Sequence, residues 1–183
     1  LSGADANSVS ILTSGSDVGT LTFNSAPDYE TKNTYLFTLS VTDGTNTSTQ
    51  DITVNITNVN EAPIITSASS FDAAENQSAV GTVTASDADG DDLTFAVTGF
   101  EIQISSTGVL TFFNNSRDYE TQSSYPITVS VSDGFNTVTQ DITINITDVN
   151  EPPSFGSSSV FSAAENQTSI GRVFVGDQEG DSL

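Results

Sequence analysis

An internal repeat with a period of ninety residues constrains this chain most. Three sequence motifs recur at that spacing: AAEN at 73–76 and 163–166, DYE at 28–30 and 118–120, and TQDITVNITNVNEAP at 49–63 with TQDITINITDVNEPP at 139–153. A period this long exceeds one supersecondary unit and suits a small domain with its own core. The sequence therefore predicts a tandem array of domains.

The proline-containing junctions suggest where the domains divide. We expect residues 1–61 to be the C-terminal two-thirds of one repeat, 62–151 a complete repeat, and 152–183 the N-terminal third of another. The two ends of the chain look complementary in this alignment. One explanation is an excerpt from a longer array; the other is a head-to-tail homopolymer, in which the opening strands of one chain complete the sandwich of the next.

Short alternating apolar segments indicate β-strands with one wet face. No segment carries the helical spacing of apolar residues over ten or more positions, so the sequence predicts an all-β fold of tandem seven-stranded Greek-key β-sandwich repeats. The inward positions that alternate with Thr and Ser include Ile127, Val129, Val131, Ile142, Ile144 and Ile146. The strands expected in the complete repeat are 64–71, 79–86, 93–97, 101–104, 109–112, 125–132 and 137–146.

Charge excludes several classes of function. The chain has 3 Lys and Arg against 24 Asp and Glu, a net charge of −21, and neither His nor Cys. Such a chain repels nucleic acid and anionic lipid surfaces, and no apolar run is long enough for membrane insertion. Disulfides, thiol nucleophiles, Ser-His-Asp triads and His-rich zinc sites are excluded, whereas hard cations with oxygen ligands are compatible.

The acidic motifs allow structural and metal-binding interpretations. Asp133-Gly134 and Asp43-Gly44 each lie between alternating strands, where Asp-Gly favours a hairpin turn. Glu75, Asp118 and Glu120, taken singly, suit solvated surface. By contrast, the four carboxylates at 87, 89, 91 and 92 repel one another unless a cation screens them. An EF-hand is excluded because it needs flanking helices and a glutamate where Thr98 stands.

Together, these motifs resemble those of the cadherin family, specifically the bacterial cadherin-like tandem repeats of large secreted or surface proteins. The resemblance covers the whole chain and implies an Ig-like sandwich architecture. AAEN resembles the early glutamate motif, DYE the Asp-Arg-Glu motif, and NVNEAP and DVNEPP the Asp-x-Asn-Asp-Asn linker. DADG and DQEG resemble the Asp-x-Asp motif, and TDG and SDG the later single-Asp motif.

The resemblance implies that each junction binds Ca²⁺ through acids of both neighbouring repeats. For the first junction it implies Asp28, Glu30, Asn58, Asn60, Glu61, Asp87, Asp89 and Asp133. For the second junction it implies Glu75, Asp118, Glu120, Asp148, Asn150, Glu151, Asp177 and Glu179. Asp43 would serve a junction upstream. Mg²⁺ suits such flexible loops less well, because it demands tight octahedral geometry.

Two classes of function follow. The preferred one is a Ca²⁺-rigidified extracellular or cell-surface spacer of a bacterial adhesin, matrix protein or filament, with neighbouring repeats as its partners and a cell-surface ligand where it serves cell adhesion. The alternative is a module that binds carbohydrate or another ligand, attached to a secreted enzyme or adhesin. The acids recur in step with the junctions, which argues against a catalytic site, so we expect no enzyme activity. The absence of Trp excludes the adhesive strand swap of vertebrate cadherins.

Overall fold

The computed structural model describes residues 1–114 and 117–180. The chain divides into two compact units. The first unit comprises Leu1–Glu61 with Ala88–Gly90, and the second unit comprises Ala62–Asp87 with Asp91–Leu183. Apart from one 3-10 turn, η1 (Ala6–Ser8), the ordered elements of the described residues are strands. None of these residues forms a helix long and apolar enough to cross a membrane. The predicted all-β class is confirmed.

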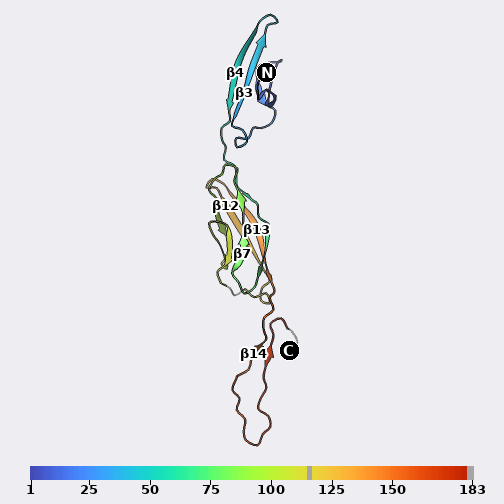
Figure 1. Ribbon diagram of the computed structural model, residues 1–183, viewed down its shortest axis with the longest axis vertical. Coiled ribbons are helices and arrows are strands. Elements are labelled where there is room, and N and C mark those ends of the chain that lie inside the picture. The colour runs from blue at the N-terminus through green and yellow to red at the C-terminus, as the bar shows by residue number, and fades with distance from the viewer. Residues whose placement is uncertain (115–116, 181–183) are drawn as a thin grey trace. The chain divides into compact units, whose positions relative to one another are not determined.

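The larger sheet of the complete repeat is built around one long hairpin. It has the strand order β6-β13-β12-β9, with β6 at Ser70–Ala74, β9 at Thr94–Val97, β12 at Ser124–Ser132 and β13 at Thr137–Thr147. Strands β12 and β13 pair antiparallel (Figure 1). Gly134 has a φ of 96°, which allows the tight turn between them. Strand β6 pairs with β13 in parallel, an arrangement that the sequence pattern does not predict.

The opposing layer consists of shorter strands. β7 (Ala79–Thr82), β10 (Ile102–Ile104) and β11 (Val109–Phe112) form a three-stranded sheet, and β5 (Ile64–Ile65) pairs with β8 (Ala85–Ser86). The chain leaves the larger sheet after β9 and returns to it at β12, which pairs with β9. This crossing between layers is the connection expected of a Greek-key sandwich.

The core lies between the two layers. Val129 and Val131 of β12, Ile144 of β13 and Leu110 of β11 are each 0% exposed, and Phe112 is 2% exposed. All six inward positions predicted from the alternation are buried: Ile127, Val129, Val131, Ile142, Ile144 and Ile146. Burying one such side chain contributes about 1.5–3 kcal/mol relative to leaving it exposed, so the hairpin β12–β13 anchors the sandwich.

Two of the seven expected strands are interrupted. The segment 64–71 forms β5 and then β6, and the segment 79–86 forms β7 and then β8, so the described residues of 62–151 form nine strand segments. Each break marks a change of partner, because β5 pairs with β8 whereas β6 pairs with β13. The Thr66 N–H donates to the Thr84 carbonyl at 2.8 Å beside the break. Alternation continues through a change of partner, so the pattern of apolar residues does not reveal it.

The remaining strands occupy repeat-equivalent positions. In the first unit, β1 (Val9–Ile11) pairs with β2 (Leu21–Phe23), and β3 (Thr34–Thr42) pairs with β4 (Thr47–Asn55). In the second unit, β14 (Ser154–Phe155) pairs with β15 (Val175–Gly176), as β5 pairs with β8 ninety residues earlier. The division into three repeats stays a prediction, and the last three residues of 152–183 lie outside the described residues.

Candidate metal centres

Each DYE motif lies in a short turn that its own aspartate holds. The Asp28 carbonyl accepts from the Lys32 N–H at 2.9 Å, and the Asp28 side chain accepts from the backbone and hydroxyl of Thr31. Asp118 makes the same contacts with Gln122 and Thr121. The hydrogen bonds from the two threonines lower the pKa of both aspartates. Both carboxylates therefore stay charged at neutral pH.

Three carboxylates that the resemblance assigned to the first junction meet in the first unit. Oxygen atoms of Glu30, Glu61 and Asp89, the first acidic cluster, lie within 4.8 Å of one another. Asp89 accepts from the Glu61 N–H at 2.9 Å and from the Asn58 amide at 2.6 Å, and these bonds lower its pKa. Partial burial and the neighbouring negative charges raise the pKa of Glu30 and Glu61.

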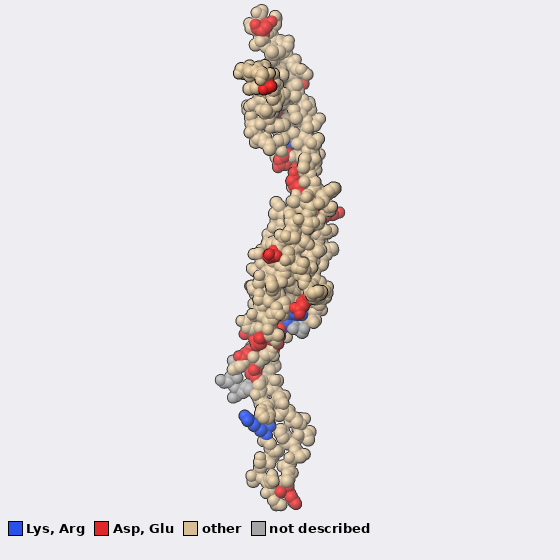
Figure 2. All heavy atoms as spheres, turned by 180° about the vertical axis from the view of Figure 1, so that it is seen from behind, with Lys and Arg blue, Asp and Glu red and all other residues tan. Residues whose placement is uncertain are grey.

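Five carboxylates assigned to the second junction meet in the second unit. Two groups share Glu120, and together they form the second acidic cluster: Glu75, Glu120, Asp148, Glu151 and Glu179. Its members Glu120, Glu151 and Glu179 are the repeat equivalents of the first acidic cluster. The Glu151 N–H donates to Glu179 at 3.1 Å, as the Glu61 N–H donates to Asp89. On the face shown in Figure 2, acidic side chains gather in separate groups and basic ones are few.

The pair Glu151 and Glu179 is incompletely satisfied. Oε2 of each side chain is buried and accepts no hydrogen bond from any described donor. A hydrogen bond that protonated Glu151 donates to the adjacent Glu179 carboxylate, together with partial burial, raises the pKa of Glu151 from its ordinary 4.5 to about 7. Two buried carboxylate oxygens without a donor are unfavourable unless a proton or a cation compensates them. A set of carboxylate and amide oxygens fits a hard divalent cation such as Ca²⁺.

Glu75 connects three segments of the second unit. Its carboxylate accepts from the Tyr119 N–H at 2.9 Å and from the Val149 N–H at 2.7 Å, and its own N–H donates to the Thr147 carbonyl. Glu75 is only 3% exposed, so the solvated-surface interpretation is wrong for this residue. It holds the DYE turn and the DVNE linker together within the second acidic cluster.

Asn76 contacts the second acidic cluster, although the sequence did not single it out as a ligand. Its amide donates to Glu151, and its N–H donates to the Arg117 carbonyl at 3.0 Å. Asn76 has a φ of 60°, and Asn166 in the second AAEN has a φ of 66°. Asn tolerates this left-handed conformation better than most residues. The recurrence of the whole AAEN motif, including its Asn, was the signal that could have identified it.

The remaining predicted ligands have various local roles. Asn60 and Asn150 donate to the backbone carbonyl of the following glutamate at 2.9 and 3.1 Å. Hydrogen bonds with Glu151 lower the pKa of Glu179 most, and Asp177 adds a smaller effect in the same direction. Asp87 accepts from the Asp91 N–H at 3.2 Å. Because Asp87 belongs to the second unit, its predicted place at the first junction stays a prediction.

The two Asp-Gly motifs form turns, as the structural interpretation predicted. Asp133 is 8% exposed and accepts from the Phe135 and Asn136 N–H groups at 2.7 and 2.5 Å. Asp43 accepts the equivalent bonds from the Asn46 and Thr45 N–H groups at 2.7 and 2.8 Å. Both bonds lower the pKa of Asp43, and the bond from Asn46 has the larger effect. Asp133 also belongs to the second unit, so its predicted role as a ligand of the first junction stays untested.

Comparisons with known proteins support the fold. Residues 60–146 match the family model described as Bacterial Ig domain. A mouse protocadherin-24 fragment, EC1-3, has a TM-score of 0.61 at 20% identity, covering 98% of this chain and 66% of that one. A mouse cadherin-23 fragment, EC22-24, has a TM-score of 0.58 at 22% identity, covering 93% and 61%. The chain thus contains a cadherin-like β-sandwich domain, and the resemblance in the motifs is confirmed at the level of fold.

A similarity in sequence extends beyond one repeat. The chain is 29% identical over 151 residues to Chitinase A from Pseudoalteromonas piscicida, a match that covers 81% of this chain. It covers only 18% of that chitinase, so the similarity concerns a small part of the larger protein.

Proposed function

We propose that this chain is a calcium-binding spacer of a secreted or surface-attached bacterial protein. The observation that carries the proposal is the pair of buried Oε2 atoms of Glu151 and Glu179, which accept no hydrogen bond from the described residues and lie within an oxygen-only cluster. The residues that would hold Ca²⁺ are the sixteen that the resemblance identified, centred on the two acidic clusters. The spacer itself is non-catalytic.

The expected ion is Ca²⁺ rather than Mg²⁺. The carboxylates come from separate loops and linkers, and Ca²⁺ accepts six to eight oxygen ligands in flexible geometry. Sites of extracellular modules are weak, with dissociation constants of roughly 10⁻⁴ to 10⁻³ M. Such sites fill only where calcium is abundant, which agrees with a location outside the cell.

The mechanism is a shift in population between junction conformations. Without a cation, the like charges of each acidic cluster repel one another and favour bent or open arrangements. Bound Ca²⁺ supplies the compensating charge, and it favours the assembled junction by its differential affinity for the two states. Neighbouring repeats of the same chain are therefore the primary partners. A head-to-tail homopolymer of such chains would show in light scattering as a mass that rises with concentration.

Thermal unfolding in EDTA, millimolar Ca²⁺ and millimolar Mg²⁺ tests the proposal. A ligand bound only by the folded state stabilises it, so we expect a Ca²⁺-specific rise in midpoint. The matched variant is the double substitution Glu151→Gln and Glu179→Gln, which keeps side-chain volume and removes both carboxyl groups. It should be more stable than the wild type in EDTA and should respond less to Ca²⁺. An unchanged wild-type midpoint in Ca²⁺ would reject the proposal.

A second candidate function is suggested by the similarity to Chitinase A. In this case the chain belongs to a secreted enzyme that acts on chitin, and the repeats bind the polysaccharide or hold another domain near it. Sedimentation with insoluble chitin separates the two roles. If the chain sediments with chitin even in EDTA, it acts as a carbohydrate-binding module. If the chain stays in the supernatant in both EDTA and Ca²⁺, the spacer role is favoured.

A further inference from the structure

Two of the few cations in this chain occupy the same place in the fold. The Lys32 ammonium lies 5.0 Å from the ring centre of Tyr35, and the Arg117 guanidinium lies 5.2 Å from that of Tyr125. The two tyrosines are ninety residues apart, and each also packs edge-to-face against a phenylalanine of the preceding strand. The chain has 3 Lys and Arg in all, so this coincidence involves most of its positive charge.

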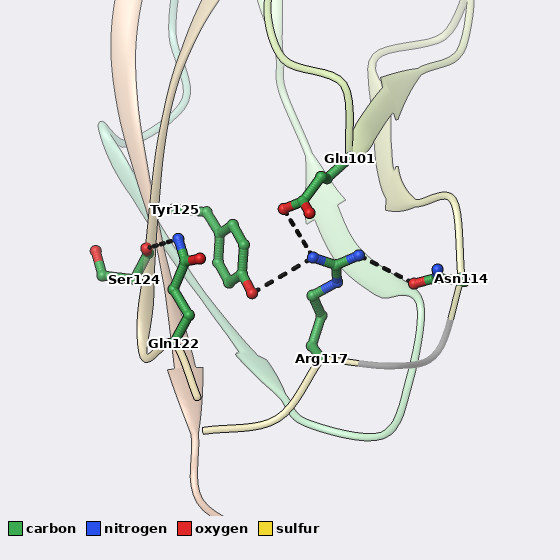
Figure 3. Close-up of polar contacts among 6 residues, drawn as sticks. All are labelled: Glu101, Asn114, Arg117, Gln122, Ser124 and Tyr125. Carbon is green, nitrogen blue, oxygen red and sulfur yellow. Dashed lines mark hydrogen bonds and ion pairs between the residues drawn. The ribbon is translucent and has the colours of Figure 1, made fainter. Parts of the chain in front are cut away.

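The acidic partners of the two cations are also equivalent. Lys32 pairs with Asp5, and Arg117 pairs with Glu101 at 2.8 Å (Figure 3). Asp5 and Glu101 each lie two residues after a glycine with positive φ, Gly3 or Gly99. The residue before each glycine bonds to the same repeat position, since the Ser2 N–H donates to Thr38 and the Thr98 N–H to Thr128.

The cations themselves come from different sequence positions. Lys32 ends the DYE turn, because its N–H donates to the Asp28 carbonyl, whereas Arg117 directly precedes Asp118 at the start of the equivalent turn. By the ninety-residue period, Gln122 is the repeat equivalent of Lys32, and Pro27 is the repeat equivalent of Arg117. The two repeats thus reach one arrangement of acid, cation and tyrosine from opposite ends of the turn.

The contacts of Arg117 extend this arrangement toward the second acidic cluster. Arg117 is 7% exposed and donates to Asn114 at 3.0 Å, and its carbonyl accepts from the Asn76 N–H. Asn76 in turn donates to Glu151. These contacts hold the guanidinium in place, so Arg117 anchors the start of the turn that carries Asp118 and Glu120. The hydrogen bond from the Asn76 N–H to the Arg117 carbonyl connects this turn to Glu151 through Asn76.

We propose that Lys32 and Arg117 are positioning residues for cation binding, which hold the DYE turns of the first and second acidic clusters in the binding arrangement before the ion arrives. This inference rests on the proposed function. Among the described contacts, neither side chain reaches an oxygen assigned to the ion, so each acts through the turn. Residues that orient metal ligands typically contribute 10–100-fold to metal affinity.

Calcium titration followed by amide NMR shifts tests each cluster separately. The reporters are the N–H groups of Thr121 and Glu151 for the second acidic cluster and those of Thr31 and Glu61 for the first. We expect Arg117→Gln to raise the calcium midpoint of the second pair about tenfold and to leave the first pair unchanged. The charge-matched control is Arg172→Gln, because Arg172 packs over Phe174 and belongs to neither DYE turn, and it should change neither midpoint.

A transplanted lysine distinguishes positioning from simple loss of charge or stability. Gln122 and Glu101 line the same hollow beside Tyr125, so a lysine at 122 can take the place that Lys32 has in the first unit. We expect Arg117→Gln with Gln122→Lys to bring the calcium midpoint back to within about threefold of wild type. Rescue from a different sequence position would not follow if Arg117 served only packing at its own site.

Three results would overturn the inference, and each differs from failure of the proposed function. The first is an unchanged calcium midpoint of the second pair in Arg117→Gln, even if its thermal stability is lower. The second is a weakened calcium midpoint in Arg117→Gln that the added Gln122→Lys does not restore. If Arg117→Gln does not fold, Lys32→Gln serves instead, because the Lys32 side chain is 42% exposed and its loss should leave the fold intact. The third result is an unchanged calcium midpoint at Thr31 and Glu61 in Lys32→Gln. A wild-type chain without any calcium response would instead reject the proposed function.

Discussion

The two acidic clusters place carboxylates at three equivalent repeat positions, but the second gathers more charge. Glu30, Glu61 and Asp89 of the first correspond to Glu120, Glu151 and Glu179 of the second, which adds Glu75 and Asp148. In the first cluster, Asn58 stands where the second has Asp148, and its amide donates to Asp89. The first cluster thus satisfies part of its charge internally, whereas the second keeps buried oxygens without a donor.

The difference shows that single side-chain changes alter the charge of a cluster while its backbone contacts stay the same. The backbone N–H of Glu61 or Glu151 donates to the facing acid in both clusters, so the frame is common. The balance of amide and carboxylate around that frame sets the charge that an ion must compensate. We expect the second acidic cluster to bind Ca²⁺ more tightly and to be the less stable of the two without it.

The largest expected effect comes from removing Glu75, for which the described first unit has no counterpart. Glu75→Ala leaves the Tyr119 and Val149 N–H groups without their acceptor, and we expect a loss of roughly 2 kcal/mol in the stability of the second unit. Urea unfolding followed at the buried Ile144 amide measures it. The control Asp72→Ala removes an exposed carboxylate that accepts from Asn145, and it should change stability by less than about 0.5 kcal/mol. Equal losses in both variants would contradict the role of Glu75.

An intermediate effect is expected from exchanging the residues that distinguish the clusters. Asp148→Asn should weaken calcium binding at the second cluster about tenfold, and Asn58→Asp should strengthen it at the first by a similar factor, because ligand charge tunes affinity. Amide titration at Glu151 and Glu61 measures the two midpoints. Asp141→Asn removes the same charge from the sheet surface, where Asp141 accepts from Thr128, and serves as control. Equal midpoints in Asp148→Asn and Asp141→Asn would show that position does not matter.

The smallest effect is a difference in pH dependence. Because the pKa of Glu151 is raised to about 7 from 4.5, the folded second unit binds a proton more tightly than the unfolded chain. In EDTA its stability should therefore fall as pH rises from about 4.5 to about 7, and calcium should bind more weakly in acid because it displaces that proton. Glu179→Gln should remove most of this dependence. Hydrogen exchange at Ile144 at several pH values measures it, and a flat profile for the wild type would contradict the interpretation.

Much of the fold and of the acidic clusters could be predicted from the sequence. Alternation identified the buried residues of β12 and β13, and the ninety-residue period identified Glu30 and Glu120 as equivalent. The recurrence of AAEN marks Asn76 as a repeated position, but its contacts with Arg117 and Glu151 could not be predicted, because they join segments that are distant in sequence. The parallel pairing of β6 with β13 escaped prediction for the same reason, since an alternating pattern specifies a face and not a neighbour.

The sequence by itself determined the period, the strand character and the carboxylates that recur at each junction, because these depend on local patterns. The tertiary structure decided which of two equivalent residues is buried. Val131 is 0% exposed and its repeat equivalent Val41 is 68% exposed, although they occupy the same position in two equivalent hairpins, β12–β13 and β3–β4. Ala73 is buried in β6 beside β13, whereas Ala163 of the second AAEN is exposed outside any strand. Burial requires a facing layer, and that layer is supplied by residues far along the chain.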